Sequence, residues 1–185
     1  MDALVLIIIL LLALAVVVGL ALYNGLVRGR LQVREGWSGV QVQLQRRGDL
    51  VPNLVETAKG YAAHERGVFE SVTRARSQLQ TATTPGEAGQ ANNALTQALR
   101  SLFAVAEAYP DLKANQNFLD LQRQLAETED KVAYARNFYN AVVMQFNSKV
   151  STIPGVFVAG PFGFHEAEFF AGDDASAALP AVKFS

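Results

Sequence analysis

The side chains most often used for metal or acid–base chemistry are sparse in this 185-residue sequence. Its two histidines are each followed by a glutamate, as His64-Glu65 and His165-Glu166. A zinc-protease helix needs a second histidine four residues after the first, but positions 68 and 169 hold valine and phenylalanine. The chain has no cysteine, and it contains no nucleophile elbow, P-loop or dinucleotide fingerprint. We therefore expect no catalytic residues, no cofactor and no metal site.

Two charged residues, Arg47 and Glu65, interrupt an otherwise apolar pattern. From Val33 to Leu79 the chain repeats an apolar position in alternating steps of four and three residues. The pattern predicts one face of a long helix packed in a bundle or coiled coil. A charge in such a seam costs stability unless it is paired, so both residues are candidates for fixing register or assembly. The alternative is a narrower seam, with both side chains reaching solvent on their long stems.

Pro52 lies inside this pattern, after Gly48-Asp49-Leu50-Val51. Proline removes an interior hydrogen bond and clashes with the preceding turn. Because the repeat keeps its phase across Pro52, we favour a kinked continuous helix. The alternative is a break there, which would add one helix to the bundle.

Two further helices are predicted after a loop at Thr83-Thr84-Pro85-Gly86. The first ends at Pro110, and residues 111–116 make the next connection. Asn117 resembles a helix N-cap, with Asp120 three residues later. The last helix is about 36 residues long and ends near Ile153. Long helices with short loops pack antiparallel, so we expect an all-α fold with an elongated antiparallel bundle of three to four long helices.

The composition indicates a membrane segment. Mean hydropathy is +0.15 and only 18% of the residues are charged. Residues 3–22 contain no charged side chain, and 20 helical residues span about 30 Å, the thickness of a bilayer core. A cleaved signal peptide is less consistent, because only Asp2 precedes the run among charged side chains and no small-x-small site follows it. The net charge of −1 also argues against a nucleic-acid partner.

The predicted organisation has four parts: an extracytoplasmic N-terminus at 1–2, a transmembrane helix at 3–22, a helical bundle at 23–154 and a tail at 155–185. Five arginines, at positions 28, 30, 34, 46 and 47, follow the span. The positive-inside rule therefore predicts a single-pass protein with a cytoplasmic C-terminal domain. Arg28, Arg30 and Arg34 are also expected to contact anionic lipid headgroups, at about 1 kcal/mol each.

Small residues recur every four positions in and beyond the span, which allows helices to approach closely. The candidates for self-association through this stripe are Ala15, Gly19, Ala21, Gly25 and Gly29. The tail is rich in glycine and phenylalanine and has little regular pattern, so it must dock on the bundle, a neighbouring subunit or the membrane interface. Its candidate docking residues are Phe157, Phe162, Phe164, Phe169, Phe170 and Phe184.

Several long motifs follow the span in a fixed order. They are Trp37-Ser38, Arg46-Arg47-x-Asp49-Leu50-Val51-Pro52, Lys59-Gly60-Tyr61-Ala62-x-His64-Glu65, Tyr109-Pro110-Asp111-Leu112-Lys113-Ala114-Asn115, Asn117-Phe118 and Ala159-Gly160-x-Phe162-Gly163-Phe164. With these motifs the chain strongly resembles the LemA family. It departs from the family's usual pattern at Gly48, where relatives carry a larger residue such as tyrosine.

The resemblance implies an all-helical protein anchored in the bacterial inner membrane and without a catalytic residue set, some of whose relatives are tied to membrane shaping. Together with the small-residue stripe, the long helices and the aromatic tail, it favours a structural or scaffolding protein, not an enzyme. Such a protein would have the lipid bilayer and copies of itself as partners, and would organise or remodel the membrane. The alternative is a membrane-tethered adaptor that binds a protein partner in stress or envelope signalling.

Overall fold

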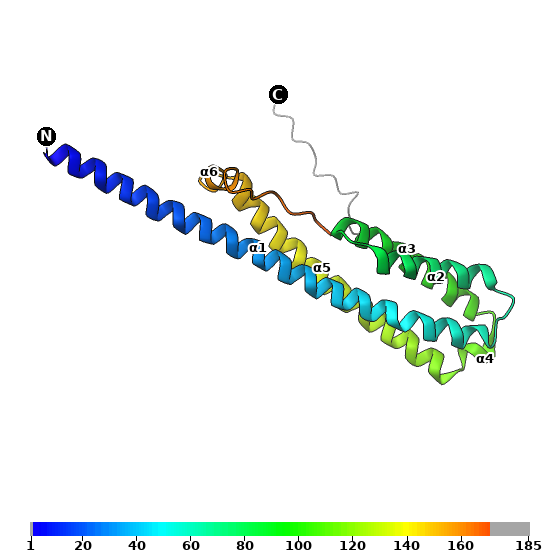
Figure 1. The fold of residues 1–185 in the computed structure, drawn as a ribbon. Helices are drawn as coiled ribbons and strands as arrows, with labels where there is room; N and C mark the ends of the chain where they lie inside the picture. Colours follow the sequence, from blue (N-terminus) through cyan, green and yellow to red (C-terminus); the bar gives the residue numbers. More distant parts are fainter. Residues whose placement is uncertain (1, 171–185) are drawn as a thin grey trace, which may run out of the picture. The chain divides into compact units, whose positions relative to one another are not determined.

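A computed structural model describes residues 2–170, and these residues form six helices and no strand (Figure 1). The expectation of an all-α protein with a long apolar N-terminal helix is therefore confirmed. The helices are α1 (Asp2–Lys59), α2 (Arg66–Thr81), α3 (Pro85–Ala106), α4 (Pro110–Lys113), α5 (Gln116–Ser151) and α6 (Val156–Ala159).

The described residues divide into two compact units. The first, here called the membrane-proximal unit, holds residues 2–36 and 139–167. The second, here called the bundle unit, holds residues 37–138 and 168–170. Helices α1 and α5 contribute residues to both units.

Helix α1 continues through Pro52, because another residue replaces the hydrogen bond that the proline removes. Pro52 has no backbone N–H, so the carbonyl of Gly48, four residues earlier, loses its helical donor. Arg76 of α2 supplies one: its Nε donates to the Gly48 carbonyl oxygen at 2.8 Å. The sequence-based preference for a continuous helix at Pro52 agrees with this arrangement.

The prediction of one helix over the whole apolar repeat from Val33 to Leu79 is wrong. Helix α1 ends at Lys59, and α2 begins only at Arg66. The amides of Tyr61 and Ala62 both donate to the Ala58 carbonyl, at 3.1 and 2.9 Å, which closes the last turn. Gly60, a poor helix former, stands at this point. The apolar repeat predicted a single helix because the buried positions of α2 continue the spacing of those of α1 in nearly the same phase.

The start of α3 follows its sequence signals. The Thr84 hydroxyl accepts a hydrogen bond from the Glu87 amide at 3.2 Å, and the Glu87 carboxylate accepts one from the Thr84 amide at 3.3 Å. These reciprocal bonds make a capping box, with Pro85 in the first turn. The pKa of the Glu87 carboxyl is lowered, because it also accepts bonds from the amide and hydroxyl of Thr83.

The connection between α3 and α5 differs from the prediction. Helix α3 ends at Ala106, and the expected connection contains the short helix α4. The N-cap of α5 is Asn115, because its side-chain oxygen accepts a hydrogen bond from the Phe118 amide at 3.0 Å. Asn117, the predicted cap, lies inside the first turn instead. The predicted length of this helix is confirmed, since α5 has 36 residues.

The core of the bundle unit draws on several of its helices. Helix α2 packs against α3, and its buried side chains are apolar. The fully buried residues with the largest volumes in this unit are Leu54, Leu95, Leu102, Leu112, Val40, Val51 and Val72. They come from α1, α2, α3 and α4, so burial of apolar surface holds these helices together.

Candidate membrane-proximal and assembly sites

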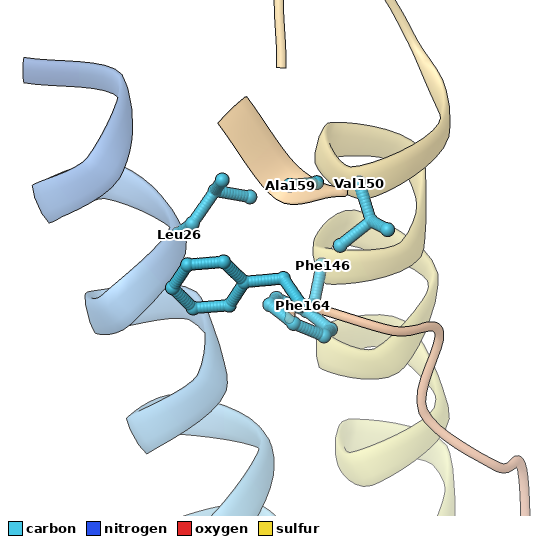
Figure 2. Packing of buried hydrophobic residues seen from close by; sticks show 5 residues of the cluster. All are labelled: Leu26, Phe146, Val150, Ala159 and Phe164. Carbon is cyan, nitrogen blue, oxygen red and sulfur yellow. The ribbon is translucent and has the colours of Figure 1, made fainter. Parts of the chain in front are cut away.

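In the membrane-proximal unit an apolar cluster joins α1, the end of α5 and the tail (Figure 2). Figure 2 shows Leu26 of α1 facing Phe146 and Val150 of α5, with Ala159 and Phe164 completing the cluster. All five residues are less than 9% exposed. The cluster therefore docks the tail onto the helix that carries the apolar N-terminal segment.

Two glycines allow the tail to fold back here. A Cβ at Gly155 would lie 1.9 Å from the carbonyl oxygen of Lys149, so only glycine fits at this end of α5. Gly163 has φ of 68°, in the left-handed region that favours glycine. After this turn, Asn147 holds the chain with two bonds to the backbone of Ala167, at 2.7 and 2.9 Å.

The predicted docking phenylalanines separate into buried and exposed groups. Phe164 and Phe170 are buried within the chain, and the Phe170 ring lies 6.4 Å from that of Trp37. Phe157 and Phe162 remain 70% and 62% exposed, and Phe169 is also exposed. Phe184 lies outside the described residues.

Arg30 contacts the tail. Its guanidinium carbon lies 4.9 Å from the centre of the Phe164 ring, in the geometry of a cation–π interaction. Arg28 and Arg34, the other predicted lipid contacts, have exposed side chains.

The predicted self-association stripe is covered at one end. A Cβ at Gly29 would lie 2.9 Å from the Phe146 ring, so the chain itself occupies this position. At Gly19 and Gly25 an added Cβ would meet nothing within 4 Å. Ala15 and Ala21 are exposed. Close approach by a second helix is therefore possible at the first four positions and not at Gly29.

Arg47 lies buried in the bundle unit, where it links three helices. Its Nη1 donates to Oδ1 of Asn92, and its Nη2 donates to Oγ1 of Thr96 at 3.0 Å. The same Nη2 forms an ion pair with the Glu129 carboxylate on α5. Burial lowers the pKa of the Arg47 guanidinium, while the charge and hydrogen bond of Glu129 oppose that shift. The planar guanidinium of Arg47, by binding side chains of α3 and α5 at once, thus specifies how these helices align with α1.

Glu65, the other charge in the repeat, lies at the turn between α1 and α2. Its carboxylate accepts a hydrogen bond from the Tyr109 hydroxyl at 3.1 Å. This bond raises the pKa of the Tyr109 hydroxyl. Beside it, the Asn115 side-chain amide donates to the Tyr61 hydroxyl at 3.0 Å. The two motifs around Tyr61 and Tyr109 therefore meet in space and hold one turn against the other.

A cleft of about 750 Å³ opens beside this turn. It is lined by Lys59, Ala63, Arg66, Phe69, Glu70, Thr73, Arg74 and Ser77. Three of these residues are basic and one is acidic, so the cleft favours an anionic ligand. Among residues 2–170, no three histidine, aspartate or glutamate side chains are grouped as a metal site would need.

Sequence reasoning missed the partners of Arg47. Asn92 is only 6% exposed, and it lies between Ala88 and Leu95 on the buried face of α3. A polar residue among the apolar positions of this helix is the signal that could have identified Asn92 as a partner of a buried charge. Glu129 carries no comparable signal, because it lies beside the buried face of α5 and is half-exposed.

Together, an apolar N-terminal helix that could cross a membrane and a packed helical bundle define a class of all-α proteins with a candidate single membrane span. The LemA family model matches residues 36–184, and the chain belongs to this family.

Curated relatives agree with this assignment. The chain is 27% identical over 174 aligned residues to magnetosome protein MamQ 2 of Paramagnetospirillum magneticum, covering 80% of this chain and 64% of the relative. It is 28% identical over 133 residues to protein LemA of Metamycoplasma hominis, covering 70% and 59% of the two chains. The chain thus spans about three fifths of the length of these relatives.

Proposed function

We propose that this LemA-family chain is a membrane-anchored structural protein that self-associates on the bacterial inner membrane and organises or remodels it. The observation that carries the proposal is the continuity of α1, which runs from the apolar segment into the packed bundle without a loop. The apolar segment and the first bundle residues are therefore parts of one helix. The arginines after the span favour a cytoplasmic bundle.

Exposed aromatic residues on α5 provide a surface for contact between copies. Tyr134 and Phe138, four residues apart on one face of α5, are 77% and 52% exposed. Aromatic side chains are enriched at the centres of protein interfaces, because they bury a large area with few rotatable bonds. This face is the proposed contact between protomers.

The test uses the full-length protein in lipid vesicles, and the absence of cysteine makes single-cysteine variants straightforward. Oxidation of Tyr134→Cys is expected to give disulfide-linked dimers. Gln122→Cys, at an exposed polar position of the same helix, is the control and should crosslink much less. Electron microscopy of the same vesicles should show ordered arrays, rings or altered membrane shape. A protein that stays monomeric in detergent and at high density in lipid would overturn the proposal.

The control variant tests orientation. In intact cells, Gln122→Cys should resist a membrane-impermeant maleimide and react only after permeabilisation. Labelling of intact cells would place the bundle outside the cytoplasm and contradict the proposed topology.

The basic cleft favours an adaptor function as the second candidate. Its occupant would be an acidic segment of a partner protein, with an apolar side chain against Phe69. A photocrosslinking residue in place of Thr73, which lines the cleft, should then capture a different protein. Recovery of self-crosslinks alone would favour the scaffold over the adaptor.

A further inference from the structure

Between α5 and the end of the tail, one short segment presents apolar side chains to the solvent. Ile153, Phe157 and Phe162 are 76%, 70% and 62% exposed. No residue from Ile153 through Phe164 is charged. Three large apolar side chains exposed on so short a segment indicate an interaction surface.

The direction of α5 brings this segment to the end of the apolar run of α1. The Phe146 ring packs against Gly29. One turn further along α5, Val150 belongs to the same buried cluster as Leu26. Each turn of α5 therefore lies nearer to the apolar run of residues 3–22, and α5 ends about where that run ends.

Contacts of Tyr23 locate the segment more closely. Tyr23 directly follows the apolar run. The Phe162 ring lies 5.1 Å from the Tyr23 ring at an interplanar angle of 62°, an edge-to-face contact. If residues 3–22 fill the hydrocarbon core, then Tyr23 and Phe162 lie at the level of the lipid headgroups.

We propose that Ile153, Phe157 and Phe162 enter the interfacial region of the bilayer and form a second membrane contact beside the span. Aromatic side chains favour this depth, and an uncharged segment has no ion to desolvate there. Lipid is the occupant that the geometry favours, because it already surrounds the neighbouring turns of α1. The inference rests on the proposed anchoring by α1. This second membrane contact would lie on the face of α1 that the tail covers.

The experiment measures the depth of nitroxide labels on the full-length protein in phosphatidylcholine–phosphatidylglycerol vesicles. Three single-cysteine variants are compared: Leu12→Cys inside the apolar run, Phe157→Cys in the segment, and Gln122→Cys, at an exposed polar position of α5, as the water-exposed control. The readout is the ratio of collision rates with oxygen, which concentrates in lipid, and with a water-soluble nickel chelate. The ratio at position 157 is expected to be several-fold above that at position 122 and to approach that at position 12.

The outcomes separate the inference from the anchoring on which it rests. A high ratio at position 12 with equal, low ratios at 157 and 122 would overturn the second contact and leave the anchor intact. Low ratios at all three positions would overturn the anchor as well. Spin–spin broadening at position 157 that disappears on dilution with unlabelled protein, together with a low ratio, would assign the patch to a second copy and also overturn the inference.

A second variant tests the role of the apolar side chains themselves. With the label at Phe162→Cys, the added change Phe157→Asp is expected to lower the ratio several-fold. Because Phe157 is 70% exposed, thermal unfolding should stay unchanged. An unchanged ratio would contradict insertion of this segment.

Discussion

Replacing Arg76 with methionine is expected to destabilise the bundle by removing the donor that serves the Gly48 carbonyl. Methionine keeps an unbranched apolar stem, so the main loss is the bond from Nε, 2.8 Å long. Gly48 is buried and Arg76 is half-buried. A hydrogen bond to a charged group contributes about 1.5–3 kcal/mol, and partial exposure puts the expected cost near the lower end, about 1–2 kcal/mol. For a chain of this size that lowers Tm by about 2–8 °C.

The same reasoning predicts that Pro52→Ala rescues this loss. Alanine restores the backbone N–H that can donate to the Gly48 carbonyl, so the oxygen keeps a partner when Arg76 is replaced. The cost of Arg76→Met should then fall to about 0.5 kcal/mol or less, which gives a coupling energy of about 1 kcal/mol in the double-mutant cycle.

The assay is thermal unfolding of the full-length protein in mild detergent, followed by helical circular dichroism. Arg74→Met is the matched control, because Arg74 lies on the same helix with an exposed side chain; it should change stability by no more than about 0.5 kcal/mol. If Arg76→Met costs the same with and without the Pro52→Ala change, the proposed replacement of the helical bond is refuted.

Three further predictions concern other contacts. Arg47→Met should lower stability by about 2–4 kcal/mol in the same assay, because it removes the donors to the buried Asn92 side chain and to the half-buried Thr96 hydroxyl on α3; an unchanged Tm and assembly state would rule out a structural role for this residue. Glu87→Gln should lower Tm relative to the unmodified protein at about pH 7. Because the pKa of Glu87 is lowered from 4.5, this difference should be present above pH 4.5 and disappear as the pH falls through the folded-state pKa; a difference that persists below it would contradict the cap. Gly29→Ala should destabilise the membrane-proximal unit while Gly25→Ala should leave Tm unchanged and weaken any self-association of the span, as measured by melting and by crosslinking in vesicles; the reverse pattern would refute the assignment.

Local patterns explain which predictions succeeded. The apolar run, the repeat of buried positions and the loop before α3 are encoded within a few neighbouring residues, so the sequence alone predicts them. The sequence does not decide between Asn115 and Asn117 as the N-cap of α5, because asparagine favours this position at either residue. Only the backbone path determines which side-chain oxygen accepts a hydrogen bond from an amide of the first turn.

The turn between α1 and α2 illustrates a different limit. Proline is intrinsically a stronger helix breaker than glycine, so Pro52 is the break that the sequence predicts more readily than Gly60. The chain nevertheless turns at Gly60, where contacts from Tyr109 and Asn115 hold it. Helix α1 passes Pro52 because Arg76, on the following helix, satisfies the freed carbonyl.

The sequence by itself determined the helical class, the apolar segment, the long last helix and the charges that interrupt the repeat, because each depends on periodicity or composition along the chain. Tertiary structure decided that Arg47 meets Asn92 and Glu129, that Gly29 is covered by Phe146, and which tail phenylalanines are buried. These outcomes depend on contacts between residues far apart along the chain, and no local pattern encodes such pairings. Tertiary packing likewise buries Phe164 in the cluster on α1 and leaves Phe157 and Phe162 largely exposed.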